Sequence, residues 1–182
     1  MAAALELFAR HGFQRTSMAQ VAESAGISRA TLYARFRDKR ALFEGLATGL
    51  VADALRLARE AWLPEADLAA NLEAAILAKD LPLHHLRHAS AHGADVLASN
   101  VTSVQQHGRV LEAGFVEFLT ARAIAAEAEG ANFAAFGGAA AFATFVSLAA
   151  AGFKEAASAE PAYRQAVRTF AAVAAAAVGI GP

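Results

Sequence analysis

The chain has 182 residues, enough for one compact domain or for a small domain joined to a larger one. It contains no cysteine, which excludes a disulfide framework and a thiolate metal site and fits the reducing cytoplasm. The formal net charge is −1, but residues 1–47 carry seven lysines and arginines against four acidic residues, and the remainder carries nine against thirteen. A basic head on an acidic body is the layout expected when only the head meets phosphate.

A first helix is predicted from Ala2 to His11, with Gly12 following its last turn. A second helix is predicted to begin at Ser17, because Ser17 and Gln20 have the spacing of a capping box. In a capping box the hydroxyl and the amide each satisfy a backbone donor that the helix start leaves free. Gly26 supplies the backbone freedom that ends this second helix.

A third short helix is predicted from Arg29 to Phe36, with Ser28 as its cap. Leu32 and Phe36 fall on one side of it, and its polar residues fall largely on the other. A small core is predicted from Phe8, Phe13, Val21, Leu32 and Phe36. Two short helices joined by a tight turn, the second with a polar outer face, describe a helix-turn-helix motif. The second helix of such a motif is suited to the major groove of DNA.

The rest of the chain shows helical spacing and no sustained strand alternation. Asp38 can cap a long helix from about Lys39 to Trp62, which Pro64 ends. Further helices are predicted over about residues 65–79, 83–97, 102–129 and 161–178. A break is predicted at residues 80–82, because Pro82 cannot continue a helix and restricts the residue before it. The chain is therefore predicted to be all-α, with about nine helices.

The segment from Gly130 to Phe153 contains no charged residue, and its length invites comparison with a membrane span. It is rich in alanine and glycine, however, and it lacks the basic flanks and aromatic belt of a span. A helix that is apolar nearly all round must be buried, either inside one monomer or against a second copy of the chain. Both kinds of burial explain the composition without a membrane.

The run GFQRTSMAQVAESAGISRATLYARFRDKRALF, residues 12–43, resembles the DNA-binding signature of the tetracycline-repressor (TetR) family. The match is without gaps at the Gly-Phe, Thr-Ser, Val-Ala, Ala-Gly-Ile-Ser, Thr-Leu-Tyr, Phe, Lys and Leu-Phe positions. Beyond about the first fifty residues, only the number and length of the helices resemble the family. The resemblance implies a helix-turn-helix DNA-binding domain at residues 1–47 and a helical effector-binding and dimerisation domain at residues 48–182.

The resemblance also implies which residues meet DNA. Phosphates would be contacted by Thr16, Ser17, Ser28, Tyr33 and Lys39, and base edges by Arg29, Ala30, Thr31 and Ala34. Arg29 is the best candidate for bidentate recognition of guanine. The two serines would cap helices with or without DNA, and Arg29 could instead be only a solvated charge.

The family's helical domain implies a small-molecule site and a homodimer. The implied pocket residues are Trp62, Leu72, Ile76, Leu86, His88, His92, Phe115, Leu119, Phe142 and Phe145. Such walls favour an apolar or aromatic effector, although each residue could equally be plain core. The implied dimer residues are Phe133, Gly137, Ala141, Phe153, Val167, Phe170, Val173 and Ala174.

His84, His88 and His92 are spaced four apart on one predicted helix, where histidines one turn apart can chelate a metal. The residues between His88 and His92 are Ala-Ser-Ala, without the acid of the usual catalytic pattern, so we expect no metal and no cofactor. A helical histidine-dependent enzyme and a membrane or scaffold protein are the alternatives. The sequence contains neither a Gly-x-Ser-x-Gly elbow nor a phosphate-binding glycine loop. We therefore expect a cytoplasmic, non-enzymatic repressor that a small effector releases from a palindromic DNA operator.

Overall fold

The computed structural model describes residues 1–88, 101–157 and 159–179, and of residues 86–88 and 101 the backbone alone. These residues form eight α-helices and one short 3-10 helix, with no strand in the described part, so the predicted all-α class is confirmed. The chain divides into a first unit, Met1–Asp53 with Leu83–Arg109, and a second unit, Ala54–Pro82 with Val110–Pro182. Each change of unit falls inside a long helix, and the predicted boundary after residue 47 stays a prediction.

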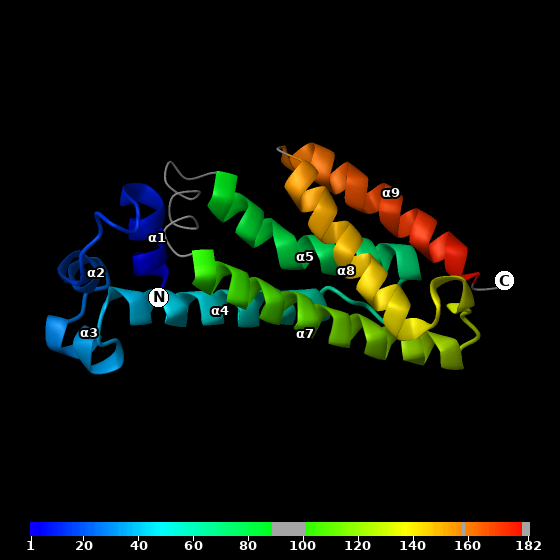
Figure 1. Ribbon diagram of the computed structural model, residues 1–182, viewed down its shortest axis with the longest axis horizontal. Helices are drawn as coiled ribbons and strands as arrows, with labels where there is room; N and C mark the ends of the chain where they lie inside the picture. Colours follow the sequence, from blue (N-terminus) through cyan, green and yellow to red (C-terminus); the bar gives the residue numbers. More distant parts are fainter. Residues whose placement is uncertain (89–100, 158, 180–182) are drawn as a thin grey trace. The chain divides into compact units, whose positions relative to one another are not determined.

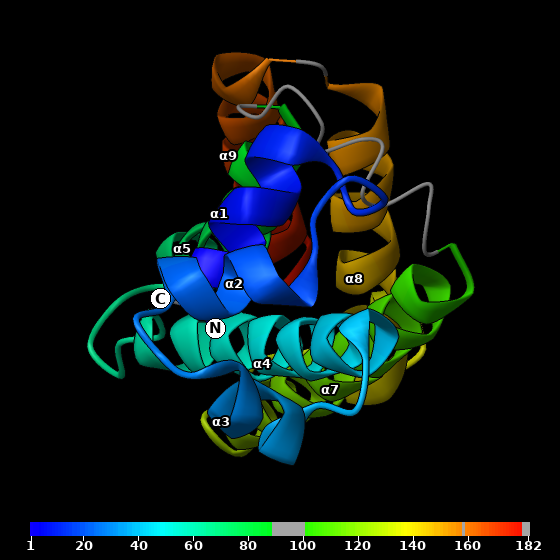
Figure 2. The ribbon, with the colours of Figure 1, turned by 90° about the vertical axis from the view of Figure 1, so that its left-hand side faces the viewer.

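The first unit contains α1 (Ala2–His11), α2 (Met18–Ser24), α3 (Arg29–Arg35) and the beginning of α4 (Lys39–Glu60). Figures 1 and 2 show α1, α2 and α3 grouped around the start of α4. Their shared core contains three phenylalanine rings, Phe8, Phe13 and Phe43, with centroids 5.3 to 6.4 Å apart. Val21 and Leu32 are buried in the same core and Phe36 packs against it, as the sequence predicts.

Local sequence signals end and begin these helices as predicted. Gly12 follows α1 with a φ of 85°, a conformation that residues with a Cβ rarely adopt. At the start of α2, Gln20 N–H donates to Ser17 Oγ at 3.2 Å and Ser17 N–H donates to Gln20 Oε1 at 2.8 Å, which confirms the capping box. Ser28 Oγ accepts from Thr31 N–H at 3.0 Å, and Asp38 Oδ1 accepts from Ala41 N–H at 2.7 Å. Each serine and Asp38 therefore satisfies a donor at a helix start.

The second unit contains the remaining described helices. They are the end of α4, α5 (Leu68–His88) up to Pro82, α7 (Val101–Ala128) from Val110, η1 (Ala134–Phe136), α8 (Ala139–Ala156) and α9 (Glu160–Val178). Helices α8 and α9 lie side by side (Figure 1). Their core is apolar and includes Leu72, Phe115, Phe142 and Val167. Among the described residues, the helices are too short or too polar to cross a membrane.

The predicted break at residues 80–82 is wrong, because α5 continues through Pro82 to His88. Proline removes one backbone donor and crowds the preceding turn, which would normally end or kink the helix. Here the two residues at the predicted break, Lys79 and Asp80, are fully buried and bonded to other helices of the second unit. We attribute the continuity of α5 to these tertiary contacts, which offset the lost hydrogen bond at exposed Pro82.

A buried ionic network connects four helices of the second unit. Its members are Lys79, Asp80, Glu112, Ser147, Lys154 and Tyr163. The Lys79 ammonium lies 3.1 Å from Asp80 Oδ1 and 3.0 Å from Glu112 Oε1. Lys154 and Tyr163 donate to the two oxygens of Asp80 at 3.0 and 2.7 Å. Buried charges with this many partners satisfy the requirement that charge taken out of water be paired.

Candidate nucleic-acid interface

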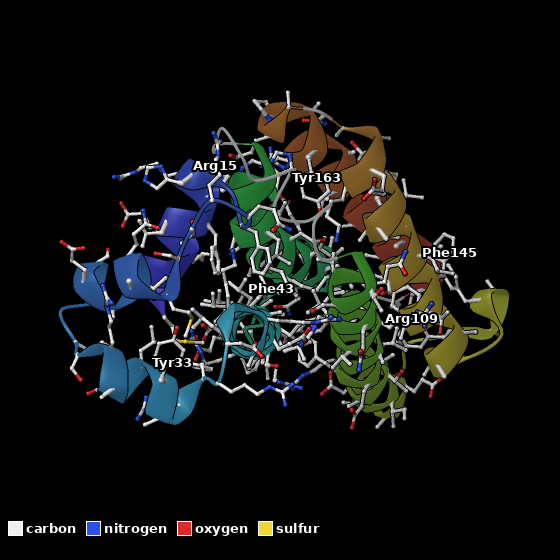
Figure 3. All side chains as sticks on the ribbon, turned by 60° about the vertical axis from the view of Figure 1, so that its left-hand side comes forward. Arg15, Tyr33, Phe43, Arg109, Phe145 and Tyr163 are labelled. Atoms are coloured by element: carbon white, nitrogen blue, oxygen red, sulfur yellow. The ribbon has the colours of Figure 1, made fainter. Side chains whose placement is uncertain are left out.

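Helix α3 turns one side toward the core of the first unit and the other toward solvent. Leu32 is 4% exposed and packs inward, which fixes the rotation of the helix about its axis. The other residues of α3 are all exposed: Arg29, Ala30, Thr31, Tyr33, Ala34 and Arg35. Tyr33, labelled on α3 in Figure 3, is half exposed. The four residues predicted to read bases, Arg29, Ala30, Thr31 and Ala34, are therefore all accessible on this one helix.

Ser17 and Ser28 lie exposed at the starts of α2 and α3. Both hydroxyls cap their helices, as described above, and Ser28 Oγ also lies 2.8 Å from Thr31 Oγ1. A hydroxyl carries two acceptor sites and one donor. The hydrogen of Ser17 is donated to Gln20 Oε1 at 3.0 Å, whereas Ser28 and Thr31 share one hydrogen bond and leave one hydroxyl hydrogen available. Both serines are accessible at the starts of their helices, and Ser17 would have to release its bond to Gln20 to donate to a phosphate.

Thr16 and Lys39, which were also predicted to contact phosphate, are bonded inward. Thr16 is 2% exposed, and its hydroxyl donates to the carbonyl of Gly12 at 2.9 Å. The Lys39 ammonium donates to the carbonyls of Phe13, Gln14 and Thr16 at 2.7, 3.0 and 2.9 Å. Desolvation lowers the pKa of Lys39 from its ordinary value. In the DNA-free protein the polar atoms of both residues have partners inside the unit, and their contact with phosphate stays a prediction.

The predicted pocket residues separate into two groups. Leu72, Ile76, Phe115, Leu119 and Phe142 lie together in the core of the second unit, and Trp62 packs against them. Phe145 does not join them, because it is 46% exposed and lies at the outer edge of α8 (Figure 3). For Leu86 and His88 only the backbone is described, and His92 lies outside the described residues.

The predicted dimer residues also fall into two groups, one buried and one exposed or partly exposed. Phe133, Val167 and Ala174 are at most 2% exposed, so the fold of a single chain already buries them. They cannot contact a second copy because the core of the second unit surrounds them. The remaining residues are exposed or partly exposed: Gly137, Ala141, Phe153, Phe170 and Val173.

The exposed side of α8 and α9 carries large apolar side chains that were not among the predicted dimer residues. Leu148 is 69% exposed and Phe145 is 46% exposed, and both lie on α8. A groove of about 640 Å³ is lined by Phe153, Ala162, Gln165, Ala166, Thr169, Phe170 and Val173. Ala141, Phe145, Leu148 and Gly152 follow one another at helical spacing, so they form one stripe. Because α8 is apolar nearly all round, its sequence alone could not show which residues face outward.

The histidines do not form a metal site within the described part of the chain, where no three His, Cys, Asp or Glu side chains converge. His84 is buried, and its ring lies 6.3 Å from that of His85. His92 and the neighbouring Asp95 lie outside the described residues.

These observations define the class of protein to which the first unit belongs. An exposed, polar recognition helix that follows a capped helix and a glycine turn is the mark of a helix-turn-helix DNA-binding protein. Residues 1–46 match the model of the bacterial regulatory proteins of the tetR family. Residues 1–46 therefore form a DNA-binding domain of the TetR family of transcriptional regulators.

Solved structures extend the likeness in fold over the whole chain. A transcriptional regulator from Rhodococcus sp. Rha1 is 20% identical, with a TM-score of 0.69 over 100% of this chain and 96% of that one. The fatty acid degradation regulator FadR from Bacillus halodurans is 15% identical, with a TM-score of 0.63 over 93% and 90%. The flavonoid-responsive regulator FrrA is 24% identical, with a TM-score of 0.55 over 97% and 93%. At these identities the likeness shows the fold alone.

Proposed function

We propose that the protein is a homodimeric repressor that binds a palindromic operator and leaves it when a small molecule binds the second unit. The outward face of α3 is the observation that carries the proposal. It presents Arg29, Thr31 and Tyr33 to solvent on a helix whose rotation is fixed by buried Leu32. A rigid helix with a short polar face fits the major groove.

The proposed contacts divide into those that read sequence and those that set register. Arg29 would donate two hydrogen bonds to a guanine, an interaction that discriminates against other bases by about 1–3 kcal/mol. Ala30 and Ala34 present methyl groups that can contact the methyl group of thymine. Ser28 and Tyr33 would donate hydroxyl hydrogens to phosphates, and Ser17 would do so on releasing its bond to Gln20 Oε1. Such contacts position the helix without reading bases.

The proposed dimer pairs the exposed stripes of α8 and α9 with those of a second copy. A two-fold axis brings the same patch of each copy together, so a self-complementary apolar face suits such a contact. Phe145, Leu148 and Val173 would bury the largest area there, since they are the exposed large apolar side chains of these helices. The dimer would present two copies of α3 about one turn of DNA apart, which predicts a palindromic site.

The proposed effector is apolar or aromatic and binds among the helices of the second unit. The chemistry of the predicted walls supports this class, because most of the described wall residues belong to one apolar core. FrrA, of similar fold, responds to a flavonoid, which is an aromatic small molecule. An effector can release DNA only by binding the DNA-free conformation more tightly than the bound one. Because the proposed partner is chromosomal DNA, the proposed location is the cytoplasm.

Selection of genomic fragments by the purified protein tests the proposal. We expect enrichment of one palindrome by the wild-type protein, and loss of that enrichment with Tyr33→Ala. The control is Tyr163→Phe, a tyrosine change in the second unit, which should leave the selected sequence unchanged. Enrichment that depends on salt but shows no common sequence would contradict the repressor proposal, because phosphate contacts alone give such binding.

A further inference from the structure

His107 lies on α7 and makes polar contacts with α4 inside the first unit. Its Nε2 lies 3.2 Å from Thr48 Oγ1, and its Nδ1 lies 2.9 Å from the carbonyl oxygen of Ser103, one turn earlier on α7. A carbonyl oxygen can only accept, so Nδ1 carries a hydrogen and the ring is oriented with Nε2 toward α4. The Glu44 carboxylate, one turn before Thr48, lies 3.8 Å from Nδ1. One histidine therefore meets both a hydroxyl and a carboxylate of α4.

The same stretch of α7 also has an apolar contact with the first unit. Val104, three residues before His107, packs against the apolar core of this unit, which includes Leu46 of α4. His107 and Thr48 are 59 positions apart in the sequence, so their contact joins distant parts of the chain. The beginning of α7 is thus attached to the first unit by one apolar and one polar side chain.

Each of the two helices in this contact leads to a different part of the molecule. On α4, Gly45 lies against the ring of Phe36, the residue that ends α3. Helix α7 is unbroken from Val101 to Ala128 and continues into the second unit, where Phe115 is buried in the core. A continuous helix is held by a hydrogen bond at every residue, so a displacement of α7 in the second unit would reach His107.

We propose that His107 is a positioning residue, which fixes α4 through Thr48 and so holds α3 in the arrangement that binds the operator. This inference rests on the proposed DNA-binding function. Without the contact, the first unit would populate further arrangements of α4 beside α7, and affinity falls with the fraction of molecules that can bind. A displacement of α7 would be passed to α3 through the same histidine.

Two substitutions of His107 separate its contact with α4 from its contact within α7. His107→Gln places an amide nitrogen where Nε2 lies and can still bond to Thr48, whereas His107→Asn places one where Nδ1 lies and can bond only to Ser103. Thr48→Val removes the hydroxyl and keeps the shape of the side chain, and Thr48→Ser keeps the hydroxyl. Gln106→Asn is the matched control, because Gln106 is the neighbouring residue of α7 and is exposed.

Affinity for the selected operator would be measured for each protein. We expect His107→Asn and Thr48→Val to bind about three- to tenfold more weakly, which is the effect of losing one hydrogen bond. His107→Gln, Thr48→Ser and Gln106→Asn should stay within about twofold of wild type. The double variant of His107→Asn with Thr48→Val should be no weaker than either single variant, because both remove the same contact. Equal affinities of His107→Gln and His107→Asn, tighter binding by His107→Asn, or additive losses in the double variant would each overturn the inference.

Backbone amide chemical shifts of the DNA-free protein test the contact without an operator. Thr48→Val should shift the amides of residues 103–107, although these residues are distant from position 48 in the sequence, and Thr48→Ser should leave them close to wild type. Unchanged amides in Thr48→Val would overturn the inference. Shifted amides in a protein that selects no operator would support the contact and count against the proposed function.

Discussion

At the scale of single residues, Asp80 shows burial and charge acting in opposite directions. Burial by itself would raise the pKa of this carboxyl, since the charged form is disfavoured away from water. The charges of Lys79 and Lys154 and the hydrogen bonds from Tyr163 and Lys154 outweigh that effect, so the pKa lies below the ordinary value of 3.8. A lowered pKa in the folded state means that the ionised form stabilises the fold.

This shift predicts how stability changes with pH. The contribution of Asp80 is complete above pH 3.8 and is lost as the pH falls through the lower pKa of the folded state. Asp80→Asn should lower the free energy of unfolding by about 3–5 kcal/mol at neutral pH, because Lys79 and Lys154 lose their shared partner. Below pH 3.8 the variant should lose less further stability than the wild-type protein does.

Urea unfolding at pH 7 and below pH 3.8 measures both effects. Glu117→Gln is the control, because Glu117 is an exposed carboxylate of the same unit. Its stability should stay within about 0.5 kcal/mol of wild type. An equal pH dependence in Asp80→Asn and wild type would contradict the assignment of a lowered pKa to Asp80.

At the scale of elements, the end of α3 fits against α4 only because residue 45 has no side chain. A Cβ atom on Gly45 would lie 2.8 Å from Cε1 of Phe36, the residue that ends α3. Gly49, one turn further along α4, has open space at the corresponding point. The two glycines therefore form a matched pair within one helix.

We expect Gly45→Ala to displace Phe36 and to weaken operator binding by moving the end of α3. Overpacking of this kind costs about 1–3 kcal/mol, against a gain in helix propensity of about 1 kcal/mol. Gly49→Ala should instead stabilise the protein by about 0.5–1 kcal/mol and leave operator binding unchanged. Thermal unfolding and operator titrations compare the two variants, and indistinguishable results for them would refute the packing argument.

How far the sequence predicts an element depends on where its partners lie. The caps Ser17, Ser28 and Asp38 bond to residues three positions away, so their pattern is visible in a short stretch of sequence. The prediction that Pro82 breaks the helix was wrong, because the contacts that offset the proline come from residues distant in the sequence. Lys79 is 33 positions from Glu112, and Asp80 is 83 positions from Tyr163.

In the candidate site, too, the features set by nearby residues could be predicted and those set by distant residues could not. The exposed face of α3 was predictable, because one buried leucine sets the rotation of a seven-residue helix. The inward bonds of Lys39 were not, because they depend on a loop 23 to 26 residues earlier. In α8 the inner Phe142 and the outer Phe145 could not be told apart, since apolar residues occupy almost every position between residues 139 and 153.

At the scale of the whole molecule, the exposed stripes of α8 and α9 are proposed to hold two copies together. Leu148→Glu would place a charge on the most exposed large apolar residue of this face, where burial against a second copy would be costly. Ile124→Glu is the control, because Ile124 is 56% exposed on α7 and lies outside the proposed interface.

Sedimentation velocity should show a dimer for the wild-type protein and for Ile124→Glu, and a monomer for Leu148→Glu. The monomeric variant should also bind the operator more weakly, because its two recognition helices no longer bind as one unit. An unchanged dimer in Leu148→Glu would place the interface elsewhere.

The central claim, that the outward face of α3 reads the DNA sequence, is tested most directly at Arg29. Affinities of wild type and Arg29→Ala would be measured for the selected operator and for a series in which each base pair is changed symmetrically. The account predicts that Arg29→Ala loses about 1–3 kcal/mol of discrimination at one guanine in each half-site and keeps its preferences elsewhere. A uniform loss of affinity, with the preference for that guanine intact, would show that Arg29 contacts only the backbone and would contradict the account.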